Sequence, residues 1–164
     1  NAPSGDIMNK LARNVLSSYS YDAEPEPVSL KNVMRQCIEL IARFPTMVTY
    51  GYQAKLRYQY EKSLFIHYPR SGVGTAENVL HLTRPDSAYT KLEADVLDLC
   101  LVLHAEHGGG NNSTFAAHVV MSAGTDAYSA IASAVGSLKG VKHGGANIKV
   151  VSMMDAVKKQ VRDE

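Results

Sequence analysis

Apolar side chains recur along this chain with the period of an α-helix, whereas the alternation typical of strands is weak almost everywhere. The first apolar stripe, with members at i, i+4, i+7, i+8 and i+11, consists of Val33, Cys37, Leu40, Ile41 and Phe44. Ser29 precedes this stripe and is a suitable N-cap, and Pro45 follows it and is expected to break or bend the chain. The pattern therefore predicts a helix over 29–44.

Three later stripes have the same helical spacing. Their members are Leu92, Val96, Leu99, Cys100 and Leu103, then Ala127, Ile131, Ala134, Val135 and Leu138, and finally Ile148, Val151, Met154, Val157 and Val161. Ser87 lies where a cap for the second stripe is expected, and the glycines at 108–110 end that stripe. These three patterns predict helices over 87–106, 126–138 and 145–162. A further helix is predicted over 113–123, in a segment rich in Ala, Ser and Gly whose small side chains suit close packing between helices.

Two segments between the predicted helices have the composition of loops. Residues 21–28 contain two prolines between acidic residues and predict a linker, and residues 61–75 contain one proline and two glycines and predict a loop. The predicted fold class is all-α, an orthogonal or antiparallel multi-helix bundle of about seven or eight helices that forms a single domain over 1–164.

Composition excludes several classes of protein. Hydrophobic residues make up 45% of the chain and charged residues 20%, and a formal net charge of +1 gives no basis for a nucleic-acid partner. No apolar run approaches the roughly 18 residues of a membrane-spanning helix, so no membrane partner is expected. Cys37 and Cys100 lie in apolar helical patterns and are predicted to be buried free thiols, which suits a reducing cytoplasm.

A first group of polar residues follows the second stripe. His104 and His107 are three residues apart and share a helix face, and a glycine-rich segment then leads to Asn111 and Ser113. Glycines let the backbone approach a small ligand, while Asn and Ser offer uncharged hydrogen-bonding groups. Two other interpretations are open: a helix end with Asn111 or Ser113 as the next cap, and a zinc site of a metal-dependent hydrolase built on the two histidines.

A second group, Gly140-Val-Lys-His143-Gly-Gly-Ala-Asn147, precedes the last predicted helix. A histidine before a helix N-terminus faces unpaired N–H groups and the positive end of the helix dipole, which favours a neutral imidazole. Such an imidazole can donate a hydrogen bond to a carbonyl oxygen and stabilise a developing enolate. Gly144 and Gly145 permit a bulky substrate to pass close to the backbone. A tight turn with an incidental histidine is the other interpretation.

The two groups together resemble the citrate synthase family. Its members have a His-x-Asp/Glu-His motif with a glycine-rich Asn-x-Ser/Thr stretch and, further along, a Gly-Pro-x-His-Gly-Gly-Ala-Asn type motif. Both motifs occur here in that order, and 36 residues separate His107 from His143. The resemblance covers residues 87–150. It departs from the family at Val141, where proline is usual, and at Gly108, where many members have Glu.

The resemblance implies an acyltransferase that condenses acetyl-CoA with oxaloacetate to give citrate and CoA, with no cofactor besides the thioester substrate and no bound metal. His143 matches the catalytic histidine that hydrogen-bonds the thioester oxygen, and Ser113 matches a serine beside it. His107 matches a catalytic histidine that binds oxaloacetate, Asn111 an asparagine at the same ligand, and His104 the more structural first histidine. The remaining substrate-binding residues implied are Gly144, Gly145 and Asn147. The nearest alternative is 2-methylcitrate synthase, which uses propionyl-CoA and shares these motifs.

The family fold is almost wholly helical, with a large domain and a small mobile domain in an obligate dimer. On this resemblance the chain is expected to be the central part of the large domain, without the small domain and the C-terminal part, and to form homodimers. The last helical pattern is still running at Glu164 without a Gly or Pro stop. The family's catalytic Asp matches no acid here, so a truncated piece with little activity of its own is expected.

Overall fold

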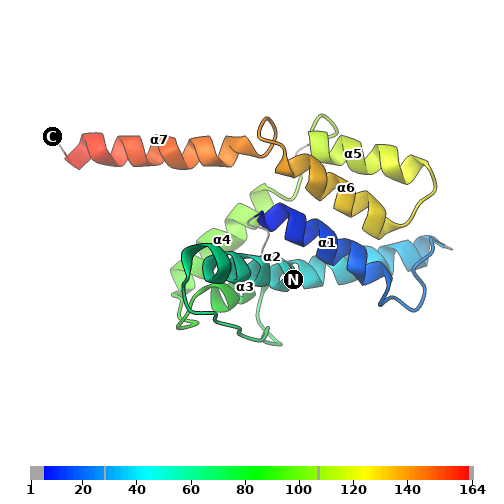
Figure 1. Cartoon of the computed structure of the whole chain (residues 1–164), viewed down its shortest axis with the longest axis horizontal. Helices are drawn as coiled ribbons and strands as arrows, with labels where there is room; N and C mark the ends of the chain where they lie inside the picture. The colour runs from blue at the N-terminus through cyan, green and yellow to red at the C-terminus, as the bar shows by residue number, and fades with distance from the viewer. Residues whose placement is uncertain (1–5, 28, 107, 163–164) are drawn as a thin grey trace.

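The computed structural model describes residues 6–27, 29–106 and 108–162 of the chain. Within these ranges seven α-helices account for most residues and no strand occurs (Figure 1). The helices are α1 (Ile7–Tyr19), α2 (Leu30–Tyr60), α3 (Thr75–Thr83), α4 (Lys91–Leu103), α5 (Asn112–Ser122), α6 (Ala127–Lys139) and α7 (Gly145–Arg162). The prediction of an all-α fold is confirmed.

The long helix α2 joins two groups of helices. On one side α6 packs against both α5 and α1, and α1 packs in turn on α2. On the other side α3 packs on α2 and carries α4, which contacts no other helix of the described part. Helix α7 extends away from the remaining described helices and packs on none of them (Figure 1).

The buried core lies where α1, α2 and α6 meet. Its fully buried members are Leu11, Val15, Leu40, Tyr128, Ala132 and Val135. Removing a large side chain of this kind from water contributes roughly 1.5–3 kcal/mol to folding. This small core therefore holds the α1–α2–α6 contact, which in turn positions α5 and the turn at the end of α6.

The N-terminal half of α2 buries polar side chains as well as apolar ones. Asn32 and Gln36 are buried, whereas Ile41 of the predicted apolar stripe is 67% exposed. Gln36 Nε2 donates to the carbonyl oxygens of Glu24, at 2.9 Å, and Pro25, at 3.0 Å. The predicted linker thus supplies acceptors for the amide nitrogen of Gln36, whereas the side-chain oxygens of Asn32 and Gln36 are buried without a hydrogen-bond partner among the described residues.

The helix predicted over 29–44 does not end before Pro45, because α2 continues to Tyr60. A proline inside a helix removes a single N–H group, and the turns on both sides can still form. The Thr49 hydroxyl donates to the Pro45 carbonyl at 2.7 Å, and Gly51 is buried where α2 packs on its neighbours. Tertiary packing therefore outweighs the local cost of the proline.

The helix ends follow capping chemistry. Ser29 caps α2, as predicted, by accepting a hydrogen bond from the Asn32 N–H at 3.1 Å. Ser87 does not cap α4: it lies in the preceding turn at a φ of 57°, and Thr90 is the N-cap. Thr90 and Glu93 form a capping box, which satisfies two N–H groups at once. For this reason α4 starts later than predicted, and it also ends earlier, at Leu103.

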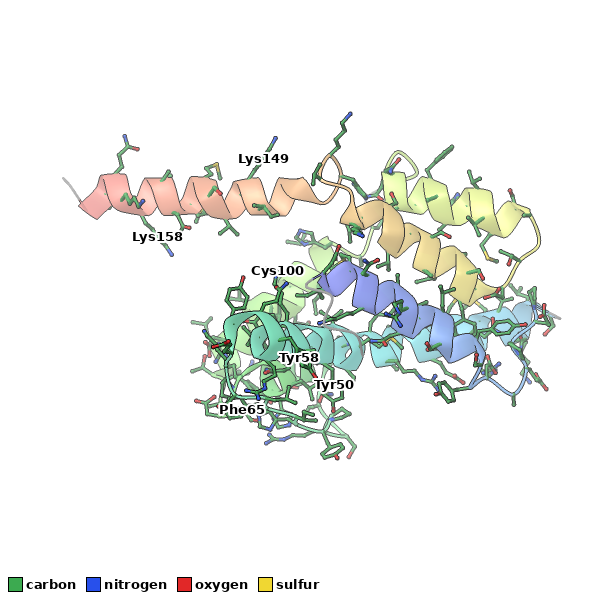
Figure 2. All side chains as sticks on the ribbon, viewed as in Figure 1. Tyr50, Tyr58, Phe65, Cys100, Lys149 and Lys158 are labelled. Carbon is green, nitrogen blue, oxygen red and sulfur yellow. The ribbon has the colours of Figure 1, made fainter. Side chains whose placement is uncertain are left out.

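The outer face of α4 leaves apolar groups open to solvent. Cys100 is exposed (Figure 2), so the prediction of a buried thiol is wrong there. Cys37 is half-buried, and both cysteines are free thiols. The reason is that α4 packs on α3 alone and nothing in the described part covers its other side. None of the described helices combines the length and the apolarity that a membrane crossing needs.

Candidate active site

The two polar groups of the sequence meet at one hydrogen bond. The Oγ atom of Ser113, in the first turn of α5, lies 2.8 Å from Nε2 of His143, in the turn between α6 and α7. Both side chains are half-buried. The contact closes a loop of 30 residues and brings one residue of each motif together.

A tight glycine turn aims His143 at α5. The N–H groups of His143 and Gly144 both donate to the carbonyl of Gly140, at 3.0 Å and 2.8 Å. A Cβ atom on Gly144 would overlap the carbonyl oxygen of Leu138, so no other residue fits this turn as it stands. A Cβ atom on Gly145 would meet no heavy atom of the described residues within 4 Å, so the backbone of Gly145 is open to a ligand.

Asn111 orients Ser113, the other partner in the contact with His143. Its Oδ1 atom caps α5 by accepting from the N–H groups of Ser113, at 2.9 Å, and Thr114, at 3.1 Å. The cap interpretation of Asn111 is therefore correct, and the same contact orients Ser113. Because capping uses the amide oxygen, the Nδ2 group is the part of Asn111 that can donate to a ligand.

One contact at this site has no sequence signal. Nδ2 of Asn112 donates to Oγ of Ser137 at 2.6 Å and ties the start of α5 to the last turn of α6. It supports the Ser113–His143 pair because His143 follows α6 by four residues. No spacing rule relates a residue in a helix N-terminus to one in the next antiparallel helix, so only the packing reveals it.

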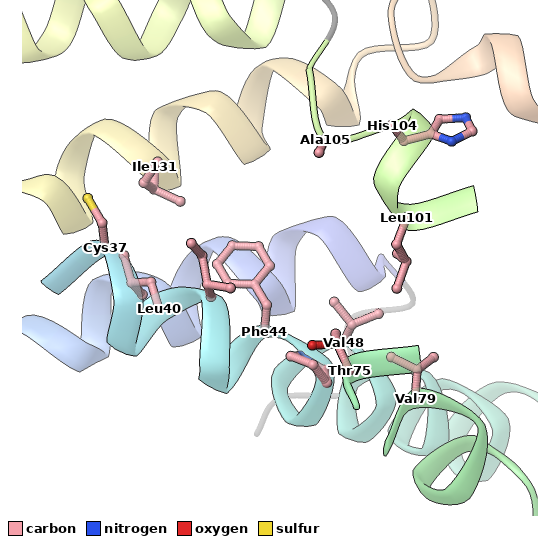
Figure 3. Close-up of a pocket in the computed structure, with 12 residues that line it drawn as sticks. Cys37, Leu40, Phe44, Val48, Thr75, Val79, Leu101, His104, Ala105 and Ile131 are labelled. Carbon is pink, nitrogen blue, oxygen red and sulfur yellow. The ribbon is translucent and has the colours of Figure 1, made fainter. Parts of the chain in front are cut away.

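His104 is the C-cap of α4 and lies, exposed, at the edge of a different space. Its Nδ1 atom lies 2.7 Å from the Cys100 carbonyl, which can only accept, so Nδ1 carries the proton. His104 and Ala105 line a hollow of about 850 Å³ whose other walls are mainly apolar side chains of α2, α3, α4 and α6 (Figure 3). Neither Ser113 nor His143 lines this hollow.

One predicted site residue is not described, and another is described only in its backbone. His107 lies outside the described residues, and so does the side chain of Asn147, whose backbone is in the first turn of α7. Of the residues expected to converge with the Ser113–His143 pair, Asn111 contacts Ser113 through the α5 cap and His104 lines a different hollow. Within the described ranges no three His, Cys, Asp or Glu side chains are grouped as metal ligands.

The resemblance to citrate synthase implies an all-α chain in which a serine lies beside a histidine of a glycine-rich motif. The structure has this arrangement at Ser113 and His143. A family profile described as "Citrate synthase, C-terminal domain" matches residues 1–163. The chain therefore belongs to the citrate synthase family.

Known relatives extend well beyond the matched region. The chain is 40% identical over 123 residues to the citrate synthase of Acidithiobacillus ferridurans, covering 73% of this chain and 29% of that protein. It is 45% identical over 86 residues to the 2-methylcitrate synthase of Mycobacterium tuberculosis, covering 52% and 21%. The crystal structure of citrate synthase from Thermotoga maritima superimposes with a TM-score of 0.68 at 25% identity, covering 99% of this chain and 41% of that one. The chain thus spans well under half of the length of each.

Proposed function

We propose that this chain supplies the His143 part of an active site that condenses acetyl-CoA with oxaloacetate to give citrate and CoA. The observation that carries the proposal is the 2.8 Å contact between Ser113 Oγ and His143 Nε2. It joins the two motifs of the family at one point. In this proposal the chain is the central part of a citrate synthase large domain.

His143 serves the oxygen of the thioester. When the Ser113 hydroxyl donates to Nε2, the neutral imidazole carries its proton on Nδ1 and can donate it to the thioester carbonyl. As a base removes a methyl proton, negative charge moves to that oxygen, and a donor already in place stabilises it. The base belongs to another segment of the protein, because the family's catalytic Asp matches no acid in this sequence.

The carbon nucleophile formed in this way attacks the ketone carbonyl of oxaloacetate and forms the new C–C bond. The ketone oxygen takes up a proton, and water then cleaves the thioester to release CoA. His107 and the Nδ2 group of Asn111 bind oxaloacetate in this proposal, and His104 supports them. The backbone of Gly145, with Gly144 and Asn147, borders the thioester.

The acyl group distinguishes two versions of the function. Relatives named citrate synthase and relatives named 2-methylcitrate synthase both match this chain. Acetyl-CoA is the substrate we propose, and propionyl-CoA is the alternative. We also propose a homodimer in the cytoplasm that needs no cofactor besides its CoA thioester substrate.

The test is a thiol-release assay on the longest polypeptide that the gene encodes, with oxaloacetate and either thioester. We expect turnover with acetyl-CoA to exceed turnover with propionyl-CoA, and His143→Ala to lower kcat by about 100-fold or more. His118→Ala is the matched control, because no proposed role involves His118 of α5. Equal turnover by the His143→Ala variant and wild type would overturn the proposal.

A further inference from the structure

A polar hollow of about 270 Å³ lies between α1 and α2, away from the candidate active site. Helix α1 contributes Lys10, Arg13, Asn14 and Ser17, at i, i+3, i+4 and i+7, so that all four lie on one helix face. None of these residues has a role in the proposed reaction. The hollow is therefore an independent feature of the molecule.

Gly51 of α2 also lines this hollow. A Cβ atom at Gly51 would lie 3.5 Å from Cγ2 of Ile7 and 4.0 Å from Cβ of Lys10, so the two helices approach closely here. This approach lays the aliphatic stem of Lys10 along α2. Because glycine brings no side chain, the space beside Lys10 stays open.

The ammonium group of Lys10 requires an acceptor that the described residues do not supply. Its Nζ atom is buried and has no hydrogen-bond partner among them. A desolvated ammonium without an acceptor is unfavourable, and it has three N–H groups to satisfy. None of the described residues that line the hollow is acidic. An anion from solution would supply the acceptor, because the flexible stem of lysine lets Nζ turn toward it.

Arg13 adds a second positive charge to the same hollow. It is exposed and lies one turn beyond Lys10. Its guanidinium is a planar fork of donors that matches two oxygens of a phosphate, while the lysine acts as a point charge. The amide of Asn14 adds a neutral donor. Two cations and an amide around a compact space suit a dianionic tetrahedral group better than a single carboxylate.

Basic side chains continue along the seam between α1 and α2. Ile7, which faces Gly51, also lines a second hollow of about 260 Å³ to which Lys55 and Lys62 contribute. We propose that the Lys10–Arg13 hollow binds the phosphate group of a small phosphorylated metabolite.

The test titrates inorganic phosphate and pyrophosphate into the 164-residue chain by calorimetry, with chloride holding the ionic strength constant. We expect saturable binding that the double substitution Lys10→Met, Arg13→Gln weakens at least tenfold. The control variant also loses two positive charges, but from α7, through Lys149→Met and Lys158→Gln. These two side chains project from that helix (Figure 2). The control is expected to bind as the wild type does.

Thermal unfolding gives a second measurement. Without phosphate, Lys10→Met should raise the Tm because it removes a buried ammonium without a partner among the described residues, and phosphate should then raise the Tm no further. Lys10→Arg keeps the charge and should keep the phosphate response. Binding by the double variant equal to that of the wild type, or a wild-type response to phosphate no greater than to chloride, would overturn the proposal.

Discussion

The hydroxyl oxygen of Ser113 and Nε2 of His143 are 2.8 Å apart, so the start of α5 and the turn before α7 share one hydrogen bond. Three further contacts hold this pair: the Asn111 cap, the Asn112–Ser137 bond and the glycine turn at Gly140. A histidine held in this way loses little freedom when it meets a substrate oxygen, which is what preorganised stabilisation of an enolate requires.

Ser113→Ala should lower kcat of the full-length gene product by about tenfold, because one hydrogen bond that orients the imidazole is worth roughly 1.4 kcal/mol. The KM for oxaloacetate should change little. Ser122→Ala is the matched control, since that hydroxyl donates to the Val119 carbonyl of its own helix. The ¹⁵N shifts of His143 should report a changed tautomer ratio in the Ser113 variant. An unchanged ratio with unchanged kcat would contradict the assigned role.

Gly144→Ala should disrupt the turn that carries His143. The new Cβ would overlap the backbone carbonyl oxygen of Leu138, which cannot rotate away as a side chain can. We expect a loss of about 1–3 kcal/mol in the free energy of unfolding, measured by urea denaturation. Gly136→Ala, inside α6 with no described neighbouring atom within 4 Å, is the matched control and should stabilise the chain by about 1 kcal/mol. Equal effects at the two glycines would count against this account of the turn.

The sequence alone predicts much of this fold because its helical stripes are long and their caps are local. The helices α5, α6 and α7 begin and end within a residue of their predicted bounds. The predicted helix ends at Pro45 and Ser87 are wrong for the same reason. The rule that proline ends a helix and the rule that serine caps one each consider a single residue without its neighbours. The packing of α2 beyond Pro45 and the Thr90–Glu93 capping box decide those ends.

Some features of the candidate site could likewise be predicted from the sequence, whereas others depend on how the helices pack. The family resemblance implies that Ser113 lies beside His143, and the hydrogen bond between them agrees with that expectation. The apolar hollow beside His104 depends on how α2, α3, α4 and α6 are arranged, and the contact between Asn112 and Ser137 depends on how α5 packs on α6. Side-chain contacts between helices far apart in sequence leave no periodic signal, so a single sequence does not predict them.

The carboxylate of Asp22 accepts hydrogen bonds from several parts of the chain, and its pKa lets us predict how the free energy of unfolding depends on pH. Burial alone would raise the pKa of Asp22, but hydrogen bonds from Tyr128, the Glu24 N–H and Arg35 outweigh it and lower the pKa to about 2. An unfolded Asp titrates near a pKa of about 4. The stabilisation by ionised Asp22 is thus complete above about pH 4 and is lost as the pH falls toward 2.

Tyr128→Phe removes the 2.6 Å hydrogen bond to Asp22 and should lower the free energy of unfolding at pH 7 by about 1–3 kcal/mol. The difference from wild type should shrink below about pH 4, where Asp22 takes up a proton in the variant first. Urea denaturation at several pH values measures both effects. Tyr21→Phe, at an 83% exposed tyrosine, is the control and should change neither. A difference that stays constant from about pH 7 to about pH 3 would show that Asp22 is not the partner that matters.

The exposed apolar faces of α4 and α7 predict that the chain associates with itself. Leu92, Val96 and Leu99 of α4 are each more than half exposed, and α7 carries a similar row beginning at Ile148. Apolar patches of this extent on a free surface favour association.

Leu99→Lys places a charge in the middle of the α4 face and should shift the protein toward monomer, because an interface cannot bury an unpaired ammonium at low cost. Tyr68→Lys, at an exposed loop residue away from both faces, should leave the distribution unchanged. Light scattering over a range of micromolar concentrations measures the average mass of each variant. A wild-type chain that stays monomeric throughout this range would contradict the homodimer, and dimers that survive Leu99→Lys would place the contact on α7 or α5 instead of α4.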